Sequence, residues 1–433
     1  MPIKPIPIAG FKGMNNVREF ALDLAAPKII LNSFVRPDGK IVKRPGYAKV
    51  LTLTSGHSLF AASKYMLFAD GLTLYSTDGV SKLALGTVAI PQSGLFYIEV
   101  NNTVYISNMY GTRILDLSTN TLREWGLALP DQPNLTLTTG NLPPGRYLVC
   151  FTNMSGGRLS GNGPTAEIIL TAEGGIAVGN IPAGGIIWMT EPNDTRLFYA
   201  GLTSPLVGLP AQTDILPSLW CQPPPFMENL CLGHGRIWGS NKEYLYYSMP
   251  FAYEWFRVAS DFFYFPKEIM MVSTVTGGIY VGFEDETIFL SGKNPAEITI
   301  IKVGDGVVKG SLAYADNFGD YQNSTLSMLG NLDSAIPVWM SQAGIFAGMH
   351  NGNVIDLTSK RVKYDAGKRA ASLFHMIGGE PQYMVSTQPG NVVGFGDSVT
   401  CEVIRNGRVF LGDYENGTRD FVGLAEVVSA EIL

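Results

Sequence analysis

The sequence predicts an all-β protein, a β-propeller of about five to six blades that carries an inserted immunoglobulin- or fibronectin-like β-sandwich. Three observations lead to this expectation. A strand–turn–strand phrase recurs five times along the chain, and a gap of sandwich size separates its second and third copies. The composition is also rich in turn formers, with 49 glycines and 26 prolines among 433 residues. Strand repeats with a period of ~40 residues are typical of propeller blades.

The phrase is an apolar run, a turn of Gly, Asn or Asp, and a second apolar run that ends in Ser or Thr. Successive side chains alternate between two faces, and both faces carry apolar or aromatic groups, as sheets packed around an axis require. Each phrase should therefore supply the middle of a four-stranded sheet. The five copies are residues 66–76, 104–118, 237–248, 279–291 and 345–358.

The spacing of the copies locates the insertions. The first two copies, and the third and fourth, are one blade of ~40 residues apart. About 25 extra residues separate the fourth copy from the fifth, and we expect them in a polar excursion near 315–334. Further strands are expected at 382–386 and 400–405. A sixth blade would be degenerate or shared between the chain ends.

The N-terminal region should contain an extended arm and a hairpin. Residues 1–16 are punctuated by Pro and Gly, and a short helix over 16–24, capped by Asn16, would end before Pro27. Strands at 32–36 and 40–44 flank a Pro-Asp-Gly turn. Such a turn favours a hairpin because Pro presets φ and Gly accepts a positive φ.

The long gap between phrases reads as a separate sandwich domain. Strands are expected at 135–139, 146–152, 166–170, 176–180 and 196–200, with turn residues between them. We therefore divide the chain into an arm and hairpin (1–56), first blades (57–130), the sandwich (131–218), remaining blades (219–395) and C-terminal strands or arm (396–433).

Composition excludes several classes of protein. The net charge is −6 and 16% of residues are charged, so a basic face for general nucleic-acid binding is not expected. The apolar fraction of 46% argues against disorder. We recognise no signal peptide or membrane span, and we expect the four cysteines, at 150, 221, 231 and 401, to be buried reduced thiols.

No motif predicts a catalytic residue, a cofactor or a metal site. The histidines, at 57, 234, 350 and 375, are scattered, and we expect them to serve turns or backbone groups. The acidic run 284–286 has carboxylates of the kind used for glycoside hydrolysis or Ca²⁺ binding, but we expect a solvated hairpin tip. Residues 304–306 lack the remainder of a phosphate-binding loop.

Two groups of side chains are candidate partner contacts. Arg36, Lys40, Lys43 and Arg44 form a small basic hairpin, which is either an exposed strand face or a contact to an acidic partner or phosphate. The segment 244–265 is rich in aromatic residues, which belong to the core or to a subunit interface. Its candidate interface residues are Trp255, Phe256, Phe262 and Phe263.

An ordered series of short motifs resembles one family. The series is Phe11-Lys-Gly-Met-Asn-Asn16, Arg44-Pro-Gly-Tyr47, Gly145-Arg-Tyr, Glu191-Pro-Asn, Gly235-Arg-Ile-Trp, Leu245-Tyr-Tyr-Ser248 and Gly278-Ile-Tyr-Val-Gly282. It resembles the tail nozzle, or tail hub, proteins of short-tailed bacteriophages, including the packaged-DNA stabilisation type. The resemblance runs through most of residues 1–310.

The resemblance implies a structural virion protein and not an enzyme. In the family, six copies form a ring below the adaptor and portal, which retains packaged DNA and conducts it during ejection. The implied partners are other copies of the chain, the adaptor or head-to-tail connector, and tail fibres or a needle. Genomic DNA would pass through the lumen without specific binding, with no membrane partner. The implied location is the virion, assembled in the host cytoplasm, and residues 311–334 are our candidate channel loop.

Two other classes of function stay open. The chain is alternatively another tail component, such as a fibre-attachment or distal tail protein. It is otherwise a propeller enzyme or lectin that acts on polysaccharide, with the sandwich as a carbohydrate-binding module. Sugar-stacking surfaces would then come from Trp125, Trp188, Trp220, Trp238 and Trp255.

Overall fold

The computed structural model describes residues 33–35, 38–43, 48–49, 51–88, 94–315, 335–358, 367–377, 380–388, 401–405, 408–412 and 425–426. Within these ranges, one 3-10 turn, η1 (Pro295–Glu297), is the only helical segment, and the remaining regular structure is β-strand. The expected all-β class is therefore confirmed. The described residues contain no helix with the length and apolar character needed to cross a membrane.

Five antiparallel sheets of four strands each form most of the fold, and we number them one to five along the chain. Sheets one and two consist of β4 (Gly56–Ala61), β5 (Met66–Asp70), β6 (Thr73–Thr77) and β7 (Lys82–Thr87), and of β8 (Phe96–Val100), β9 (Thr103–Ser107), β10 (Thr112–Asp116) and β11 (Thr121–Glu124). Sheet three consists of β19 (Glu228–Gly233), β20 (Arg236–Asn241), β21 (Tyr244–Tyr247) and β22 (Phe262–Tyr264). Sheets four and five consist of β23 (Met271–Val275), β24 (Gly278–Gly282), β25 (Glu286–Ser291) and β26 (Thr299–Asp305), and of β27 (Ala313–Ala315), β28 (Ile336–Met340), β29 (Ile345–Gly348) and β30 (Val354–Asp356).

Tight turns connect the strands within each sheet. Asn101 and Asn102, between β8 and β9, both have positive φ, at 50° and 61°. His234 and Gly235, between β19 and β20, repeat the pattern at 53° and 73°. Two consecutive residues with positive φ match a type I′ turn, whose twist suits an antiparallel hairpin.

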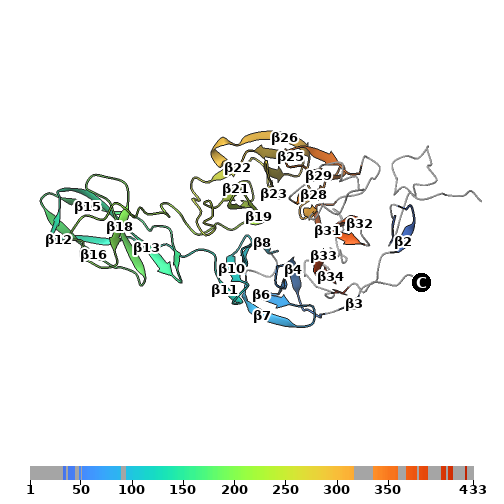
Figure 1. Cartoon of the computed structure of the whole chain (residues 1–433), viewed down its shortest axis with the longest axis horizontal. Helices are drawn as coiled ribbons and strands as arrows, with labels where there is room; N and C mark the ends of the chain where they lie inside the picture. The colour runs from blue at the N-terminus through green and yellow to red at the C-terminus, as the bar shows by residue number, and fades with distance from the viewer. Residues whose placement is uncertain are drawn as a thin grey trace, which may run out of the picture.

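The sheets follow one another around a common centre, as Figure 1 shows. Apolar side chains fill the space between neighbouring sheets, for example Leu67 and Leu74 of sheet one against Val104 and Leu115 of sheet two. The first strands of successive sheets also lie side by side, as β8 with β19 and β19 with β23 do. Radially arranged four-stranded sheets that pack face to face make a β-propeller.

Strands from both ends of the chain close the ring. The hairpin of β31 (Arg369–Ile377) and β32 (Glu380–Gln388) lies beside sheet five. The hairpin of β33 (Cys401–Arg405) and β34 (Arg408–Gly412) lies between β31 and β4. Next to it, β35 (Ala425–Glu426) pairs with β3 (Ala48–Lys49). The ring therefore has two sheet positions that the repeated phrase does not mark, and it extends past residue 395, where we expected it to end.

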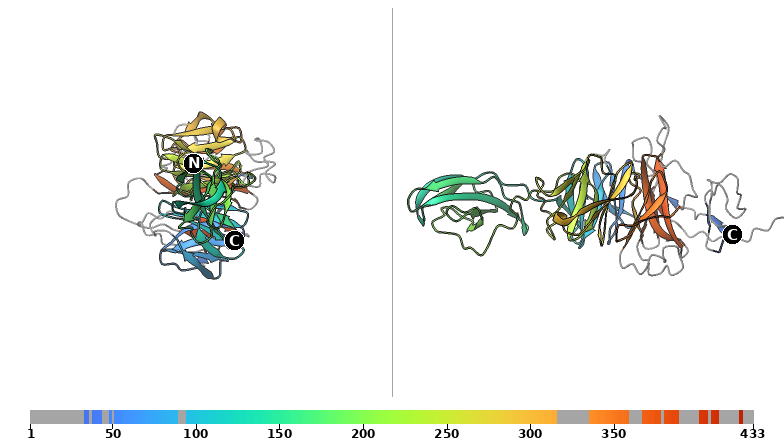
Figure 2. Two further views of the ribbon diagram at one scale, coloured as in Figure 1. Left: turned by 90° about the vertical axis from the view of Figure 1, so that its left-hand side faces the viewer. Right: turned by 90° about the horizontal axis from the view of Figure 1, so that it is seen from above.

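The expected insertion is a β-sandwich between sheets two and three in the sequence, and it projects from one side of the ring (Figures 1 and 2). One sheet pairs β12 (Asn134–Leu142) with β16 (Gly174–Gly179). The other contains β13 (Gly145–Ser155), β14 (Arg158–Leu159), β15 (Ala166–Leu170), β17 (Gly185–Met189) and β18 (Phe198–Gly201). Its immunoglobulin or fibronectin likeness stays a prediction.

The core of the sandwich lies between its two sheets. Tyr147, Val149 and Phe151 alternate along β13 and are fully buried, as inward positions of a strand should be. They pack against Ile176 and Val178 of β16. The strand β17 was not expected from the sequence, because its five residues are all buried and show no alternation.

Four of the five phrases mark the middle strands of a sheet, but the fifth does not. Residues 345–358 cover β29 and β30, the third and fourth strands of sheet five. The hairpin of β1 (Ser33–Val35) and β2 (Ile41–Lys43) matches the one expected near the N-terminus. The expected helix over 16–24, and residues 316–334 of the candidate channel loop, lie outside the described residues; the loop's first part contains β27.

Candidate functional site

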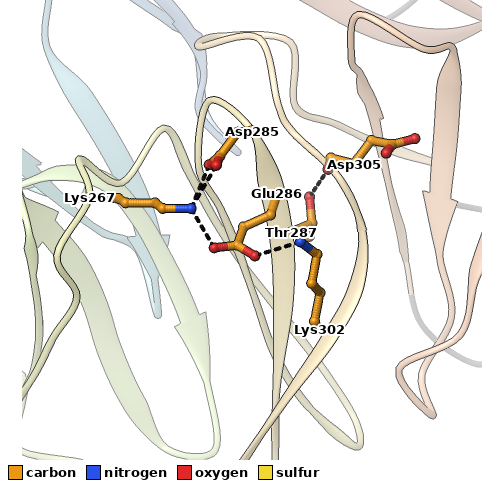
Figure 3. A network of polar contacts seen from close by, with 6 residues as sticks. All are labelled: Lys267, Asp285, Glu286, Thr287, Lys302 and Asp305. Carbon is orange, nitrogen blue, oxygen red and sulfur yellow. Dashed lines mark hydrogen bonds and ion pairs between the residues drawn. The ribbon is translucent and has the colours of Figure 1, made fainter.

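Two residues of the acidic run, Asp285 and Glu286, lie in an ion-pair network at the β24–β25 turn of sheet four (Figure 3). Lys267 Nζ is 2.7 Å from an Asp285 oxygen and 2.7 Å from Glu286 Oε1. Lys302 Nζ is 2.9 Å from the second Glu286 oxygen. The Asp285 and Lys302 side chains are 64% and 68% exposed, so the network faces solvent as expected for a hairpin tip.

The electrostatics of this network do not suit general acid catalysis. Hydrogen bonds from Lys267 and Lys302 hold the pKa of the Glu286 carboxyl below its ordinary value. The hydrogen bond from Lys267 likewise lowers the pKa of Asp285. Glycoside hydrolysis needs one carboxyl whose pKa is raised so that it carries a proton. These two side chains are therefore a charged surface network and not an acid–base pair.

One histidine does meet a serine within hydrogen-bond distance. His57 Nδ1 lies 2.8 Å from Ser58 Oγ, and His57 Nε2 lies 3.0 Å from the carbonyl oxygen of Gly71. Because a carbonyl only accepts, Nε2 donates and Nδ1 accepts from the hydroxyl. Ser58 has a φ of 58° at an irregularity in β4, and its Oγ also accepts from the Leu95 amide. His57 is only 2% exposed, so the His57–Ser58 pair stabilises the irregular backbone of β4 and is not open to a substrate.

The other histidines occupy different settings. His234 lies in the β19–β20 turn, where burial lowers its pKa and its ring faces the carbonyl oxygen of Gly278 at 3.4 Å. His350 follows β29 in the loop before β30, and the side chain of His375 lies outside the described residues. In the described part of the chain, no group of three or more His, Cys, Asp or Glu side chains is placed to hold a metal ion.

The four candidate interface aromatics do not form one surface. Phe256 is 1% exposed and packs with Trp125 and Ile237 between sheets two and three, so the prediction that it contacts another subunit is wrong. Phe263 packs against Trp238 in the core between sheets three and four. The Trp255 indole N–H donates to the carbonyl oxygen of Leu159 in the sandwich at 2.8 Å.

Phe262 belongs to a cluster of rings on the outer strands of sheet three. Its ring lies 5.4 Å from that of Tyr244 and 5.9 Å from that of Tyr246. Tyr264, 59% exposed, lies 5.2 Å from Tyr244. Cross-strand aromatic pairs of this kind stabilise a sheet. This tyrosine-rich cluster and Phe251, which is 80% exposed, are the parts of segment 244–265 that keep the character of an interface.

The basic hairpin is described only in part. Lys43 is exposed on β2, and Lys40 is 76% exposed with its Nζ 3.1 Å from Asp38 Oδ2 of the same turn. Arg36 and Arg44 lie outside the described residues. A contact between the two lysines and a partner stays a prediction.

The tryptophans proposed for sugar stacking are mostly core residues. Trp125, Trp188 and Trp238 are 1%, 5% and 0% exposed, so they offer no face to a ligand and that expectation is wrong for them. Trp220 is 65% exposed and has a φ of 61°, a strained value for a bulky residue. The sequence did not predict this exposure, because the residue type alone does not distinguish an exposed tryptophan from a buried one.

An ion-pair cluster that we did not predict from the sequence, centred on Lys309, connects the inner strands of several sheets. Lys309 Nζ, before β27, lies 2.6 Å from Glu228 Oε2 in β19 and 3.3 Å from Glu268 Oε1 before β23. The carbonyl oxygen of Lys309 accepts from the Ala370 amide in β31. Lys309 therefore ties together three sheets and the following hairpin.

Tyr314 on β27 lies near residues of sheets three and four. Burial raises the pKa of its phenol, and the neighbouring Cys231 of β19 raises it further, while Ser273 of β23 acts in the opposite direction. The residue nevertheless has 39% of its surface exposed.

The described cysteines are buried thiols. Cys150, Cys221 and Cys231 are free and at most 3% exposed. Burial raises the pKa of Cys150 and of Cys231 to about 12. Because the thiolate is the reactive form, these residues are inert packing groups, as the sequence led us to expect.

No protein-family model and no curated protein matches the chain. Solved structures with some similarity include BBS1N in complex with ARL6DN, at 9% identity over 90% of this chain and 97% of that chain, with a TM-score of 0.34. The N-terminal domain of Nup159 has 11% identity, coverages of 83% and 73%, and a TM-score of 0.28. Apo AztD from Citrobacter koseri has 13% identity, coverages of 71% and 74%, and a TM-score of 0.30. Likeness at this level says nothing of activity or partners.

Proposed function

We propose that this chain is a structural protein of a bacteriophage virion, a subunit of the tail nozzle or hub. Six copies would form a ring that continues the channel of portal and adaptor, retains the packaged DNA and conducts it during ejection. The proposal rests on the motif series that resembles this family. The observation that supports it most is that four of the five described motifs of the series pack against one another in two pairs.

The first pair lies at one end of the sandwich. The Arg146 amide donates to Asn193 Oδ1 at 3.1 Å, and the Asn193 amide donates back to the Arg146 carbonyl at 2.8 Å. A Cβ on Gly145, which has a φ of 155°, would lie 2.7 Å from Cβ of Pro192. The Gly-Arg-Tyr and Glu-Pro-Asn motifs thus contact each other directly, and the close approach of Pro192 leaves room only for a glycine at position 145.

The second pair lies in sheet three. Amide and carbonyl of Ile237 bond to the hydroxyl and amide of Ser248 at 3.0 and 2.9 Å. Arg236 donates to the Ser248 carbonyl at 2.6 Å, and its guanidinium carbon lies 5.2 Å from the centre of the Tyr247 ring. The Gly-Arg-Ile-Trp and Leu-Tyr-Tyr-Ser motifs therefore contact each other across the β20–β21 hairpin.

A DNA passage could take two courses, through the centre of one propeller or between copies of the chain. Lys309 joins the first strands of several sheets through its ion pairs with Glu228 and Glu268. We propose that the passage runs between copies of the chain and not through the centre of one propeller, because these ion pairs connect the inner strands. A net charge of −6 suits a wall along which DNA slides without adhering.

Assembly with the adaptor tests the proposal. The purified chain is expected to form closed rings of six copies, alone or on adaptor complexes, which mass photometry and electron microscopy detect. Antibody against the chain should label the tail tip of intact virions. A chain that stays monomeric in the presence of adaptor and is absent from purified virions would overturn the proposal.

A further inference from the structure

The sandwich contacts the ring through more than its two chain connections. The segment of residues 158–163 begins with β14, the second strand of the β13–β14 hairpin. It contacts both connections and sheet three. We call this segment the strut. Without it, the sandwich would hang on residues 125–133 and 217–227 alone, and relative motion would be the default expectation for two domains joined in that way.

An ion pair fastens the first residue of the strut. Arg158 Nε lies 2.9 and 2.7 Å from the two carboxylate oxygens of Glu254, in the loop between β21 and β22, and Nη2 also contacts this carboxylate. The Arg158 and Glu254 side chains are 15% and 21% exposed. Nη2 further donates to the Glu124 carbonyl at 3.0 Å, at the end of β11. One side chain of the sandwich thus binds sheets two and three together.

The same loop of sheet three receives contacts from both sides. The Trp255 indole donates to Leu159 of the strut at 2.8 Å, and the Trp125 indole of the first connection donates to the Tyr253 carbonyl at 2.8 Å. Phe256 and Trp125 fill the core between sheets two and three, with their rings 6.0 Å apart. The first two residues of the strut, Arg158 and Leu159, therefore lie at the seam between these sheets.

The second half of the strut is wedged between the two connections. A Cβ on Gly161 would lie 1.6 Å from the Cys221 carbonyl oxygen, and one on Gly163 would lie 2.3 Å from the Pro130 carbonyl oxygen. Asn162, 6% exposed, accepts from the Trp220 amide at 2.7 Å. Backbone packed on backbone leaves no flexible side chain that a hinge motion would displace at low cost.

We propose that the strut holds the sandwich as a rigid arm of the propeller. A partner that binds the sandwich then acts mechanically on the seam between sheets two and three and does not merely swing a tethered module. The inference does not depend on the proposed function, because it concerns only the joint between the two domains.

Distances between spin labels test the rigidity. Labels on Thr136→Cys in the sandwich and Ile300→Cys in sheet four occupy exposed strand positions. The described native cysteines are buried, and Cys401→Ser removes the remaining thiol. Electron–electron double resonance should give one narrow distance distribution for the otherwise unchanged protein. A broad distribution there would overturn the proposal.

Strut variants supply the second arm of the experiment. The pair Arg158→Gln with Glu254→Gln removes both charges, so neither is left buried alone. Adding Gly161→Ala pushes the strut off its connection. We expect loss of the narrow peak and faster amide exchange at residues 249–257, with each domain still folded by circular dichroism.

A matched control removes an ion pair that lies within the sandwich. Arg146→Gln breaks the contact of Arg146 Nη1 with Glu167 Oε2, at 3.5 Å, whose side chains are 41% and 49% exposed. This variant should keep the narrow distribution. A folded strut variant that also keeps it would show that the strut does not fix the arm.

Discussion

The hydroxyl of Tyr280 in β24 lies 2.6 Å from the carbonyl oxygen of Met349, and the two residues belong to neighbouring sheets of the ring. The same hydroxyl is 3.0 Å from the Asn353 carbonyl oxygen. Tyr280 is fully buried, and burial raises the pKa of its phenol, so the neutral hydroxyl is the form that donates. The Tyr280 phenol therefore links sheet four to carbonyl groups of the loop between β29 and β30 in sheet five.

Replacing this phenol should weaken the contact between sheets four and five. Tyr280→Phe removes the phenol hydrogen bond to this loop, whose two carbonyl oxygens still accept from the amides of Gly352 and Met349. We therefore expect the free energy of unfolding to fall by about 0.5–1.5 kcal/mol. Urea denaturation measures the change. Tyr264→Phe, at a position 59% exposed, is the control and should stay within about 0.5 kcal/mol of the parent. Equal losses in both variants would contradict the role of Tyr280.

A methyl group added at Gly278 should be poorly tolerated. Its Cβ would lie 2.1 Å from the Leu290 carbonyl oxygen on the paired strand β25. Gly278→Ala must therefore move one strand of sheet four, and we expect a loss of about 1–3 kcal/mol in the free energy of unfolding. Gly208→Ala is the matched control, because no atom lies within 4 Å of the Cβ it adds. Thermal unfolding of the two variants distinguishes these outcomes.

The ion pairs of Lys267 should make stability depend on pH at both extremes. The folded pKa of Glu286 is lowered, so its contribution is complete above the unfolded pKa of about 4.3 and is lost as pH falls through the folded value. The folded pKa of Lys267 is raised, so its contribution is complete below about 10.4 and is lost as pH rises through the folded value.

A neutral variant separates the acid effect from other groups. Glu286→Gln should flatten the fall of the unfolding midpoint between neutral pH and the acid range, and Glu173→Gln, at an exposed turn position, should leave it as in the parent. Melting curves across pH give the comparison. An unchanged acid slope in Glu286→Gln would show that the network does not contribute.

The buried thiols should resist modification while the protein is folded. Burial places the pKa of Cys150 and Cys231 at about 12, so little thiolate is present at neutral pH and reagent has no access. Mass spectrometry of peptides after treatment with a maleimide should find these two cysteines unlabelled in the native protein and labelled in denaturant. Labelling of either one without denaturant would contradict their placement in the core.

The strand pattern predicted the propeller, but it placed the fifth phrase on the wrong strands of its sheet. Four copies fall on the middle strands of a sheet, but residues 345–358 cover β29 and β30. Consecutive hairpins of an antiparallel sheet share one pattern, so the sequence does not say which hairpin is central. The true second strand, β28, is buried at all five positions and contains Pro337, so it does not resemble the other copies.

Side-chain roles were less predictable than the fold. Phe256 and Phe262 lie six residues apart in one aromatic segment, yet the first is core and the second joins a ring cluster on the outer strands. Cores and interfaces both favour aromatic residues, so residue type does not separate them. The contacts of Arg158 were also unpredictable, since Glu254 lies 96 residues away and the two meet only through the fold.

The pairing of β3 with β35 has a consequence for how the molecule is made. A ribosome releases β3 long before β35 exists, so this early strand must wait with its hydrogen-bonding groups unpaired. Sheets one to five can form from neighbouring segments during synthesis, whereas the circle is completed only after β35 has been made. A newly made chain can therefore pair β3 with a strand of another molecule before its own β35 is in place. A high local concentration of such chains favours exchange of β35 between molecules.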